Sequence, residues 1–347
     1  MTLALVWLSQ RLGLIDISDI NDIKGLGSVP LPGMPVCLKV VNTASGWTAY
    51  CAQNNGYISV IRGTSQGMTK IIDISLDNAG KANFLDVSLD LSVDNKWVYA
   101  MTTSSGTNIK QMFVLDTTSL ALTNGLAEFF NGWAKILYQL GSVNYLCTPE
   151  TSPANQLTIS FWSVGQNPPT LAKSFILYGV PFINDQKNTA KSFNGFQDSL
   201  VYICNPSNNI ITGIRVLGNL SYTQLPNITL PANMTALAPV SNDGKAYVSA
   251  GANLCIVDKD KGVIQTIPLN SSAKAIDVSS DSSAAYLLLS GGFNDNVYKV
   301  DFKRLNIITQ GRLPWLNPTG FTLIPPANPQ TRNVSNSGCS CKKKKKE

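Results

Sequence analysis

A tyrosine that recurs in one local context constrains the fold of this 347-residue chain more than any other feature. Each copy has an apolar strand, a small polar turn, a second strand with tyrosine near its start, a loop, and a third strand that often ends in aspartate. The clearest copies pair Tyr99 with Asp116, Tyr247 with Asp258, and Tyr286 with Asp301. Weaker copies centre on Tyr50, Tyr145 and Tyr202. Intervals of 39 to 57 residues between these tyrosines, with period-two alternation inside the runs, are typical of four-stranded repeat units.

The two ends of the chain complete one further copy. Residues 3–8 and 14–16 read as the second and third strands of a unit that lacks its first strand, and residues 318–325 read as a first strand alone. Joined, they close a ring and remove the sheet edges that an open array would expose. We therefore predict an all-β fold over residues 1–325, a seven-bladed β-propeller closed by N- and C-terminal strands that share one blade.

Two segments carry a resemblance to a known repeat. The runs Asn242-Asp-Gly-Lys-Ala-Tyr-Val and Ser280-Asp-Ser-Ser-Ala-Ala-Tyr-Leu, with the Ile/Val-Asp strand ends, resemble the YVTN-type β-propeller repeat of surface-layer and lactonase-like proteins. The resemblance spans most of residues 3–325. It implies a fold and not an activity, because propellers host many functions.

One segment competes with this interpretation. Residues 126–140 place apolar side chains at helical spacing. Gly132 and the phase of the repeat favour a turn followed by a strand over residues 134–140.

The chain has no histidine, which excludes histidine-dependent triads, general bases and metal sites. It also lacks a Cys-x-x-Cys pair and a phosphate-binding glycine loop. Asp16, Asp19 and Asp22 are conceivable calcium ligands. However, Asp16 occupies the strand-end position of the repeat, which favours a turn role. We expect no catalytic, cofactor-binding or metal-binding residues and no cofactor.

Seven cysteines are present, and five of them lie in apolar, strand-like runs. Free buried cysteine behaves as a small hydrophobe, so these five are expected to be core thiols. One alternative stays open, a strained disulfide across a hairpin between Cys37 and Cys51.

The C-terminal residues 326–347 have the composition of a flexible linker and end in a basic run, which predicts a tail separate from the propeller. Of the net charge of +6, the last six residues hold +4. The candidate contacts for tethering or polyanion binding are Cys339, Cys341, Lys342, Lys343, Lys344, Lys345 and Lys346. A solvated extension that aids solubility is the alternative interpretation.

The missing catalytic groups and the weakly charged body favour a non-enzymatic binding or scaffold protein, for instance a structural component of a virion or surface assembly. Protein partners are expected on the propeller faces, and nucleic acid or anionic membrane at the tail; no small-molecule substrate is inferred. The alternative is a lactonase-like or calcium-dependent hydrolase that uses carboxylates at the central channel. The chain lacks a basic n-region and a long apolar run, so we expect a soluble protein, cytoplasmic or virion-associated.

Overall fold

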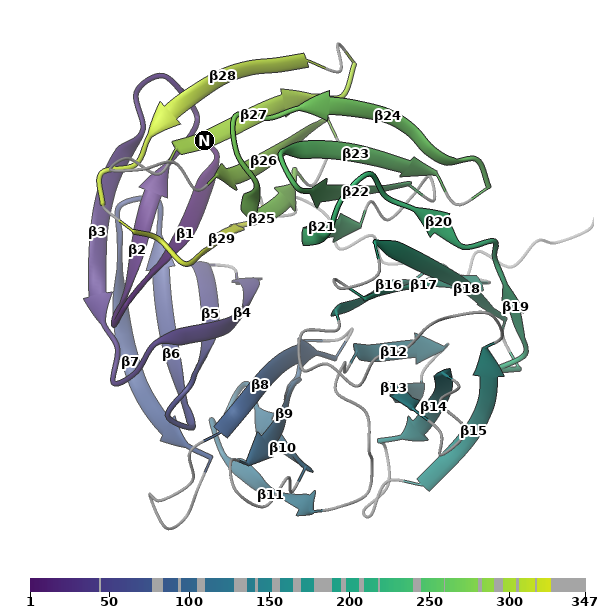
Figure 1. Ribbon diagram of the computed structural model, residues 1–347. Coiled ribbons are helices and arrows are strands. Elements are labelled where there is room, and N and C mark those ends of the chain that lie inside the picture. The colour runs from purple at the N-terminus through teal and green to yellow at the C-terminus, as the bar shows by residue number, and fades with distance from the viewer. Residues whose placement is uncertain are drawn as a thin grey trace, which may run out of the picture.

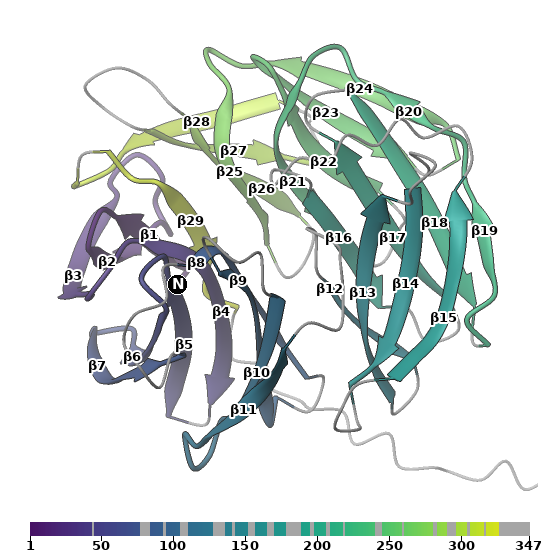
Figure 2. The same ribbon diagram turned by 60° about the horizontal axis from the view of Figure 1, so that its bottom comes forward.

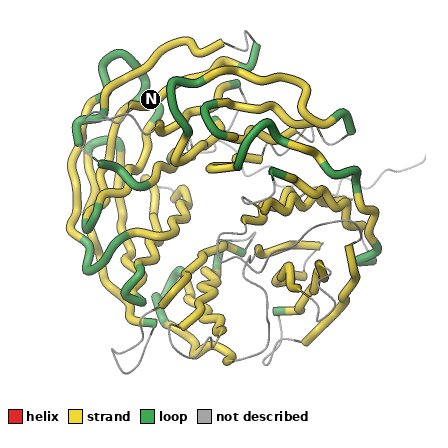
Figure 3. Tube along the Cα trace, viewed as in Figure 1, coloured by secondary structure: helices red, strands yellow, loops and turns green. Residues whose placement is uncertain are grey.

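The computed structural model describes a chain built from β-strands (Figures 1 and 3). The described residues are 1–43, 45–76, 84–92, 95–104, 110–127, 136–140, 143–151, 157–164, 170–177, 189–194, 198–205, 209–217, 219–239, 245–258, 260–279, 283–289, 296–303, 306–315 and 317–325. No helix occurs in these ranges, so none of them holds an apolar helix long enough to cross a membrane.

The strands assemble into small antiparallel sheets, six with four strands and one with five. The closing sheet contains β29 (Gly320–Leu323), β1 (Leu3–Leu8), β2 (Arg11–Asp16) and β3 (Lys24–Pro30). Next along the chain are β4 (Pro35–Thr43), β5 (Gly46–Gln53), β6 (Tyr57–Thr64) and β7 (Gly67–Ser75), then β8 (Phe84–Leu91), β9 (Trp97–Ser104), β10 (Lys110–Asp116) and β11 (Leu122–Ala127). The next two sheets contain β12 (Ile136–Leu140), β13 (Val143–Thr151), β14 (Leu157–Ser163) and β15 (Thr170–Leu177), and then β16 (Thr189–Asn194), β17 (Asp198–Asn205), β18 (Ile210–Leu217), β19 (Tyr222–Gln224) and β20 (Ile228–Thr229). The last two contain β21 (Met234–Pro239), β22 (Lys245–Ala250), β23 (Asn253–Asp258) and β24 (Gly262–Pro268), and then β25 (Ala273–Val278), β26 (Ala284–Leu289), β27 (Asn296–Asp301) and β28 (Asn306–Arg312).

The sheets stand around a common centre, with the first strand of each sheet nearest the middle of the ring (Figures 1 and 2). Contacts run between neighbouring first strands, from β4 to β8 and onward through β12, β16, β21 and β25 to β29. This arrangement confirms the prediction of an all-β propeller. The predicted closure is also confirmed, because β1 pairs antiparallel with β29, with Ala4 opposite Leu323 and Trp7 opposite Gly320.

The predicted count of seven four-stranded blades is not fully met by the sheets. Six of them follow the four-strand order. The sheet of β16–β19 departs from it, because the short strand β20 also pairs with β18, with Ile228 opposite Ile211. The predicted regular blade is therefore found in six sheets only.

The repeat tyrosines occupy the second strand of their sheets, counted from the middle of the ring. They are Tyr50 on β5, Tyr99 on β9, Tyr145 on β13, Tyr202 on β17, Tyr247 on β22 and Tyr286 on β26. Four of these rings, at positions 50, 99, 247 and 286, are buried. The tyrosine therefore fills space between neighbouring sheets, where large aromatic area stabilises the packing.

The repeat aspartates end the third strands and fold the chain into the following turn. Asp116 accepts backbone N–H bonds from Thr118 and Ser119 at 2.8 and 2.7 Å. The other three do the same: Asp16 bonds Ser18, Asp258 bonds Asp260 and Lys261, and Asp301 bonds Lys303. An aspartate that caps its own turn in this way explains why the third strand stops there.

The core lies between sheets rather than inside one layer. One apolar cluster joins the sheet of β21–β24 to that of β25–β28, and another joins the closing sheet to that of β4–β7. A third cluster joins the β4–β7 and β8–β11 sheets. These sheets thus bury apolar faces against their neighbours, which ties this part of the ring together.

The open structural alternatives are resolved where the chain is described. The helix candidate at 126–140 contains strand β12 at Ile136–Leu140, as the repeat phase predicted, and residues 128–135 lie outside the described residues. Asn95, in the turn before β9, has a φ of 56°, a left-handed conformation that asparagine tolerates.

The cysteine predictions are met where side chains are described. Cys51 and Cys255 are buried free thiols, and Cys37 is a half-buried one. The alternative prediction of a disulfide between Cys37 and Cys51 is wrong, because both are free thiols. Cys37 lies opposite Ala52, so the two thiols point to opposite faces of the sheet and join different core clusters. The side chains of Cys147 and Cys204 lie outside the description.

A hydroxyl-lined groove between two sheets

The sheet of β4–β7 departs from the repeat at one register position. In the three sheets that carry both the buried tyrosine and a third-strand aspartate, the aspartate stands two positions beyond the cross-strand partner of the tyrosine, as Asp258 does beyond Ile256. In the β4–β7 sheet Tyr50 pairs with Val60, so the equivalent residue is Arg62. Arginine cannot accept the turn N–H bonds. Strand β6 instead continues to Thr64 and turns tightly into β7, with Thr64 opposite Gly67.

The first hairpin of the same sheet is also long, and glycine permits its shape. Strands β4 and β5 pair up to Thr43 opposite Gly46. Gly46 has a φ of 146°, and a Cβ there would lie 2.2 Å from the carbonyl oxygen of Gly63. A Cβ on Gly63 would lie 2.1 Å from Cζ2 of Trp47. The close approach of Gly46, Trp47 and Gly63 therefore requires residues without side chains at both glycine positions.

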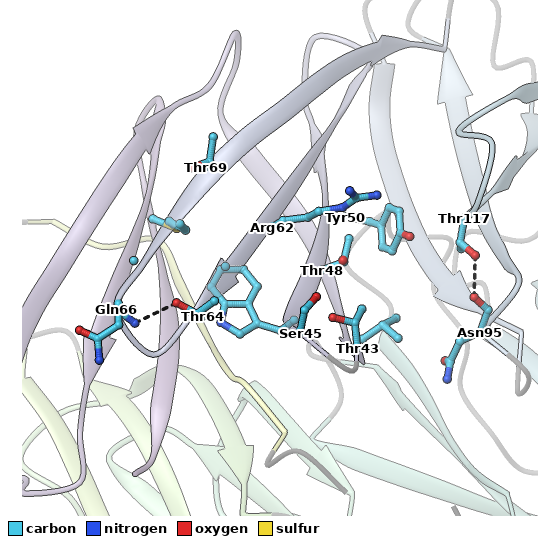
Figure 4. Close-up of a pocket in the computed structure, with 15 residues that line it drawn as sticks. Thr43, Ser45, Thr48, Tyr50, Arg62, Thr64, Gln66, Thr69, Asn95 and Thr117 are labelled. Carbon is cyan, nitrogen blue, oxygen red and sulfur yellow. Dashed lines mark hydrogen bonds between the residues drawn. The ribbon is translucent and has the colours of Figure 1, made fainter.

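The two long hairpins form one wall of a groove that we call the hairpin groove. Its opposite wall includes the turn residues Asn95 and Thr117 of the β8–β11 sheet, and its volume is about 870 Å³ (Figure 4). The lining residues are Val41, Thr43, Ser45, Trp47, Thr48, Tyr50, Arg62, Gly63, Thr64, Gln66, Gly67, Met68, Thr69, Asn95 and Thr117. The volume lies within the range typical of small-molecule sites, about 300–1,000 Å³.

A hydrogen bond orients the threonine on the β8–β11 wall of the groove. The Thr117 hydroxyl donates to the Asn95 carbonyl oxygen at 2.9 Å, so its single proton is committed. Tyr50 lines the opposite wall and interacts with Thr117 across the groove.

Burial keeps Tyr50 protonated. Desolvation raises the pKa of its phenol, and the smaller opposing effects come from the Arg62 charge and the Thr117 hydrogen bond. The Asp116 charge adds a weaker upward effect on the pKa. The phenol is therefore a neutral, fixed group and does not serve as a base near neutral pH.

Among the lining residues that the structure describes, Arg62 alone carries a charge. Its side chain is exposed, and it forms no ion pair with any carboxylate in the described part of the chain. Thr48 and Thr69 are its cross-strand neighbours, so the guanidinium lies in a row of hydroxyl-bearing side chains (Figure 4). Trp47, on the other face of the sheet, has a buried Nε1 with no hydrogen-bond partner among the described residues.

The described lining of the groove is rich in hydrogen-bonding groups. The fifteen lining residues that the structure describes include no carboxylate, thiol or imidazole. Seven carry hydroxyl groups and two carry amides. Such a lining presents hydrogen-bond donors and acceptors with one fixed positive charge.

The middle of the ring holds the other charged groups of interest. Lys39 on β4 pairs with Asp90 on β8 at 2.9 Å, and this carboxylate raises the pKa of the lysine above its ordinary value. Asp277 on β25 accepts backbone N–H bonds from Leu323 and Val278. Both carboxylates thus have partners from the protein itself.

The structure describes the contacts of the calcium candidates but not of the tail candidates. Asp16 caps its turn, Asp19 accepts an N–H bond from Asn21, and Asp22 pairs with Lys24, so the calcium alternative receives no support from these contacts. No group of three or more metal-ligating side chains occurs within the described ranges. The tail candidates, from Cys339 to Lys346, lie outside the described residues.

The groove residues were missed at the sequence level, because threonine, serine and glycine near a hairpin are ordinary turn residues. A usable signal was present. The copy around Tyr50 lacks the aspartate that ends the third strand and has Arg62-Gly-Thr-Ser-Gln-Gly in its place.

No protein-family model matches the chain, and no relative is found among curated proteins. Solved structures do match over most of the chain. A functionally unknown protein from Desulfotomaculum acetoxidans aligns with a TM-score of 0.69 at 9% identity, over 94% of this chain and 100% of that one. A putative 6-phosphogluconolactonase from Bacteroides uniformis aligns with a TM-score of 0.66 at 11% identity, over 93% and 99%. A protein from Lactobacillus plantarum aligns with a TM-score of 0.64 at 12% identity, over 93% and 100%. At these identities the likeness supports the propeller fold alone.

Proposed function

We propose that this chain is a non-enzymatic binding protein that holds its partners on the faces of a β-propeller. The observation that carries the proposal is the described lining of the hairpin groove, which offers many hydrogen-bonding groups and one cation but no carboxylate, thiol or imidazole to act as a base or to activate a hydroxyl. The two described inner-strand carboxylates considered above, Asp90 and Asp277, already have protein partners. The site is thus suited to recognition.

The experiment is an activity assay set beside a binding assay. Purified full-length protein is tested for hydrolysis of a panel of lactones, with and without added calcium, and for ligand binding by thermal shift. The proposal expects no turnover above the buffer rate. Turnover that disappears in Asp90→Asn or Asp277→Asn would contradict it.

A lactonase-like hydrolase is the second candidate. The likeness in fold to two putative 6-phosphogluconolactonases from Bacteroides, over 93% of this chain, favours it. Asp90 and Asp277 on the inner strands would be its carboxylates. We rank it second because the contacts of both carboxylates are structural, and the chain has no histidine.

The finer assignments belong to the same proposal. We infer that the five-stranded sheet serves as the seventh blade and that the repeat is of the YVTN type. A structural role in a virion or surface assembly, in the cytoplasm or on the particle, is one version of the binding function.

The tail, residues 326–347, is proposed as a tether for nucleic acid or anionic membrane. Its five consecutive lysines carry the charge for this contact. Truncation after Pro325 should leave the melting temperature unchanged and abolish salt-sensitive binding to DNA or anionic vesicles. Equal binding by the truncated protein would place the polyanion contact on the propeller instead.

A further inference from the structure

We propose that the hairpin groove binds a sugar acid, meaning a hydroxylated sugar that carries one carboxylate. This inference deepens the proposed binding function and rests on it. It names the ligand chemistry that the groove would recognise.

The first argument is the balance of charge. Arg62 is the one charged group in the lining, and it is exposed without an ion-pair partner among the described residues. A guanidinium pairs with a carboxylate through two parallel N–H···O bonds, which match in charge and geometry. A phosphate monoester carries about −1.5 to −2 charges at neutral pH, more than a single arginine offsets.

The second argument is the phenol beside the arginine. Tyr50 lies two residues from Thr48, the cross-strand partner of Arg62, and both side chains line the groove. Burial raises the pKa of this phenol, so it is a neutral hydroxyl near neutral pH. A neutral hydroxyl can pair with a sugar hydroxyl, while the carboxylate of the same ligand meets Arg62.

The third argument is the rest of the lining. Thr48 and Thr69 flank Arg62 on the neighbouring strands, and Ser45, Thr64 and Gln66 come from the two hairpin ends (Figure 4). These side chains both donate and accept, as the hydroxyl groups of a sugar do. The volume of about 870 Å³ accommodates a ligand of drug-like size, so a disaccharide is a suitable probe.

The test uses full-length protein and three probes, namely a disaccharide ending in glucuronic acid, the matching disaccharide ending in glucose, and glucose 6-phosphate. Binding is measured by calorimetry, or by ligand-observed NMR where affinity is millimolar. We expect the acidic disaccharide to bind about tenfold or more tightly than the neutral one, because a hydrogen bond to a charged group is among the stronger ones. Glucose 6-phosphate should bind more weakly than the acidic disaccharide.

Two variants and a matched control locate the site. Arg62→Gln should reduce acidic binding to the neutral level, and Tyr50→Phe should weaken both disaccharides by a similar factor. The control is Arg215→Gln on β18, where arginine occupies the equivalent register position of another sheet, two residues beyond the partner of Tyr202. This control should bind like the unchanged protein, and all variants are checked by thermal melting.

Several outcomes would overturn the inference. They are equal affinity for the acidic and neutral disaccharides, tighter binding of glucose 6-phosphate, an equal loss in Arg215→Gln, or no binding of any probe by a folded protein. None of these touches the proposed absence of catalysis. Lactone turnover that requires Asp90 or Asp277 would instead overturn the proposed function.

Discussion

The sheets of β21–β24 and β4–β7 begin from the same plan and end differently. Both place a buried tyrosine on the second strand, Tyr247 in one and Tyr50 in the other. In the first, Asp258 ends β23 and caps its turn. In the second, Arg62 takes that position and the strands continue into long hairpins. The residues of the repeat therefore stabilise the ring of sheets. The sheet that lacks the third-strand aspartate carries the hairpin groove instead.

The difference has a simple physical origin. A carboxylate at the third-strand end satisfies the N–H groups of the turn and stops the strand. Without it, the backbone groups are satisfied by further strand pairing, which continues to Thr64 and Gly67. In the β4–β7 sheet, the change of residue type thus accompanies a longer hairpin, which forms a wall of the groove.

The largest expected effect tests the buried tyrosine that both sheets share. Tyr247→Ala should cost about 3 kcal/mol or more of unfolding free energy, as for other truncations of large core side chains. The ring is buried and stacks on Phe302 with centroids 4.0 Å apart. Chemical denaturation would measure the loss.

Tyr247→Phe is the matched control, because it keeps the stacked ring and should cost clearly less. An alanine variant as stable as the unchanged protein would mean that the tyrosine does not hold the sheets together. The buried tyrosine would then no longer be a stabilising feature that the two sheets have in common.

The next effect tests the β4–β7 sheet, where the repeat is interrupted. Gly63→Ala should destabilise the protein by about 1–3 kcal/mol, the usual range for overpacking, because the new methyl group collides with the Trp47 ring. Gly67→Ala, in the same hairpin, has no atom within 4 Å of the new Cβ and should be nearly neutral. Thermal melts of the two variants compare them directly. Equal melting temperatures would show that the Trp47 contact does not define the groove wall.

A smaller effect concerns the ion pair that joins the two sheets flanking the groove. Lys39→Met should cost about 1 kcal/mol, since the Lys39–Asp90 pair is partly exposed and screened by solvent. Lys24→Met removes the more exposed pair with Asp22 and should cost less. Because the folded pKa of Lys39 is raised above 10.5, its contribution is complete below pH 10.5 and is lost as the pH rises through the folded value.

Urea denaturation at pH 7 and pH 9 checks the direction of the Lys39 pKa shift. The penalty of Lys39→Met should be the same at both values. A penalty that shrinks between pH 7 and pH 9 would mean that the lysine loses its proton below its ordinary pKa.

Much of the fold could be predicted because tyrosine, turn and aspartate act locally and recur. The closing pair of β1 and β29 followed from the unmatched ends of the repeat. The extra pairing of β20 with β18 could not be predicted, since a two-residue strand leaves no periodic signal.

The candidate site was less accessible to prediction. A sequence marks out residue types with intrinsic reactivity, whereas most of the groove lining is threonine, serine, glycine and apolar or aromatic side chains, with one arginine. Its character depends on a register relation, with Arg62 two residues beyond the partner of Tyr50, and register becomes visible only after the strands are paired.

The most direct test of the central claim, that binding occurs where the repeat breaks, is hydrogen–deuterium exchange with and without the glucuronic acid disaccharide. We predict slower exchange in residues 46–50 and 62–69 and unchanged exchange in the corresponding parts of the regular sheet, residues 245–250 and 258–263. Slower exchange in the inner strand of residues 273–278, with the groove unchanged, would contradict the account.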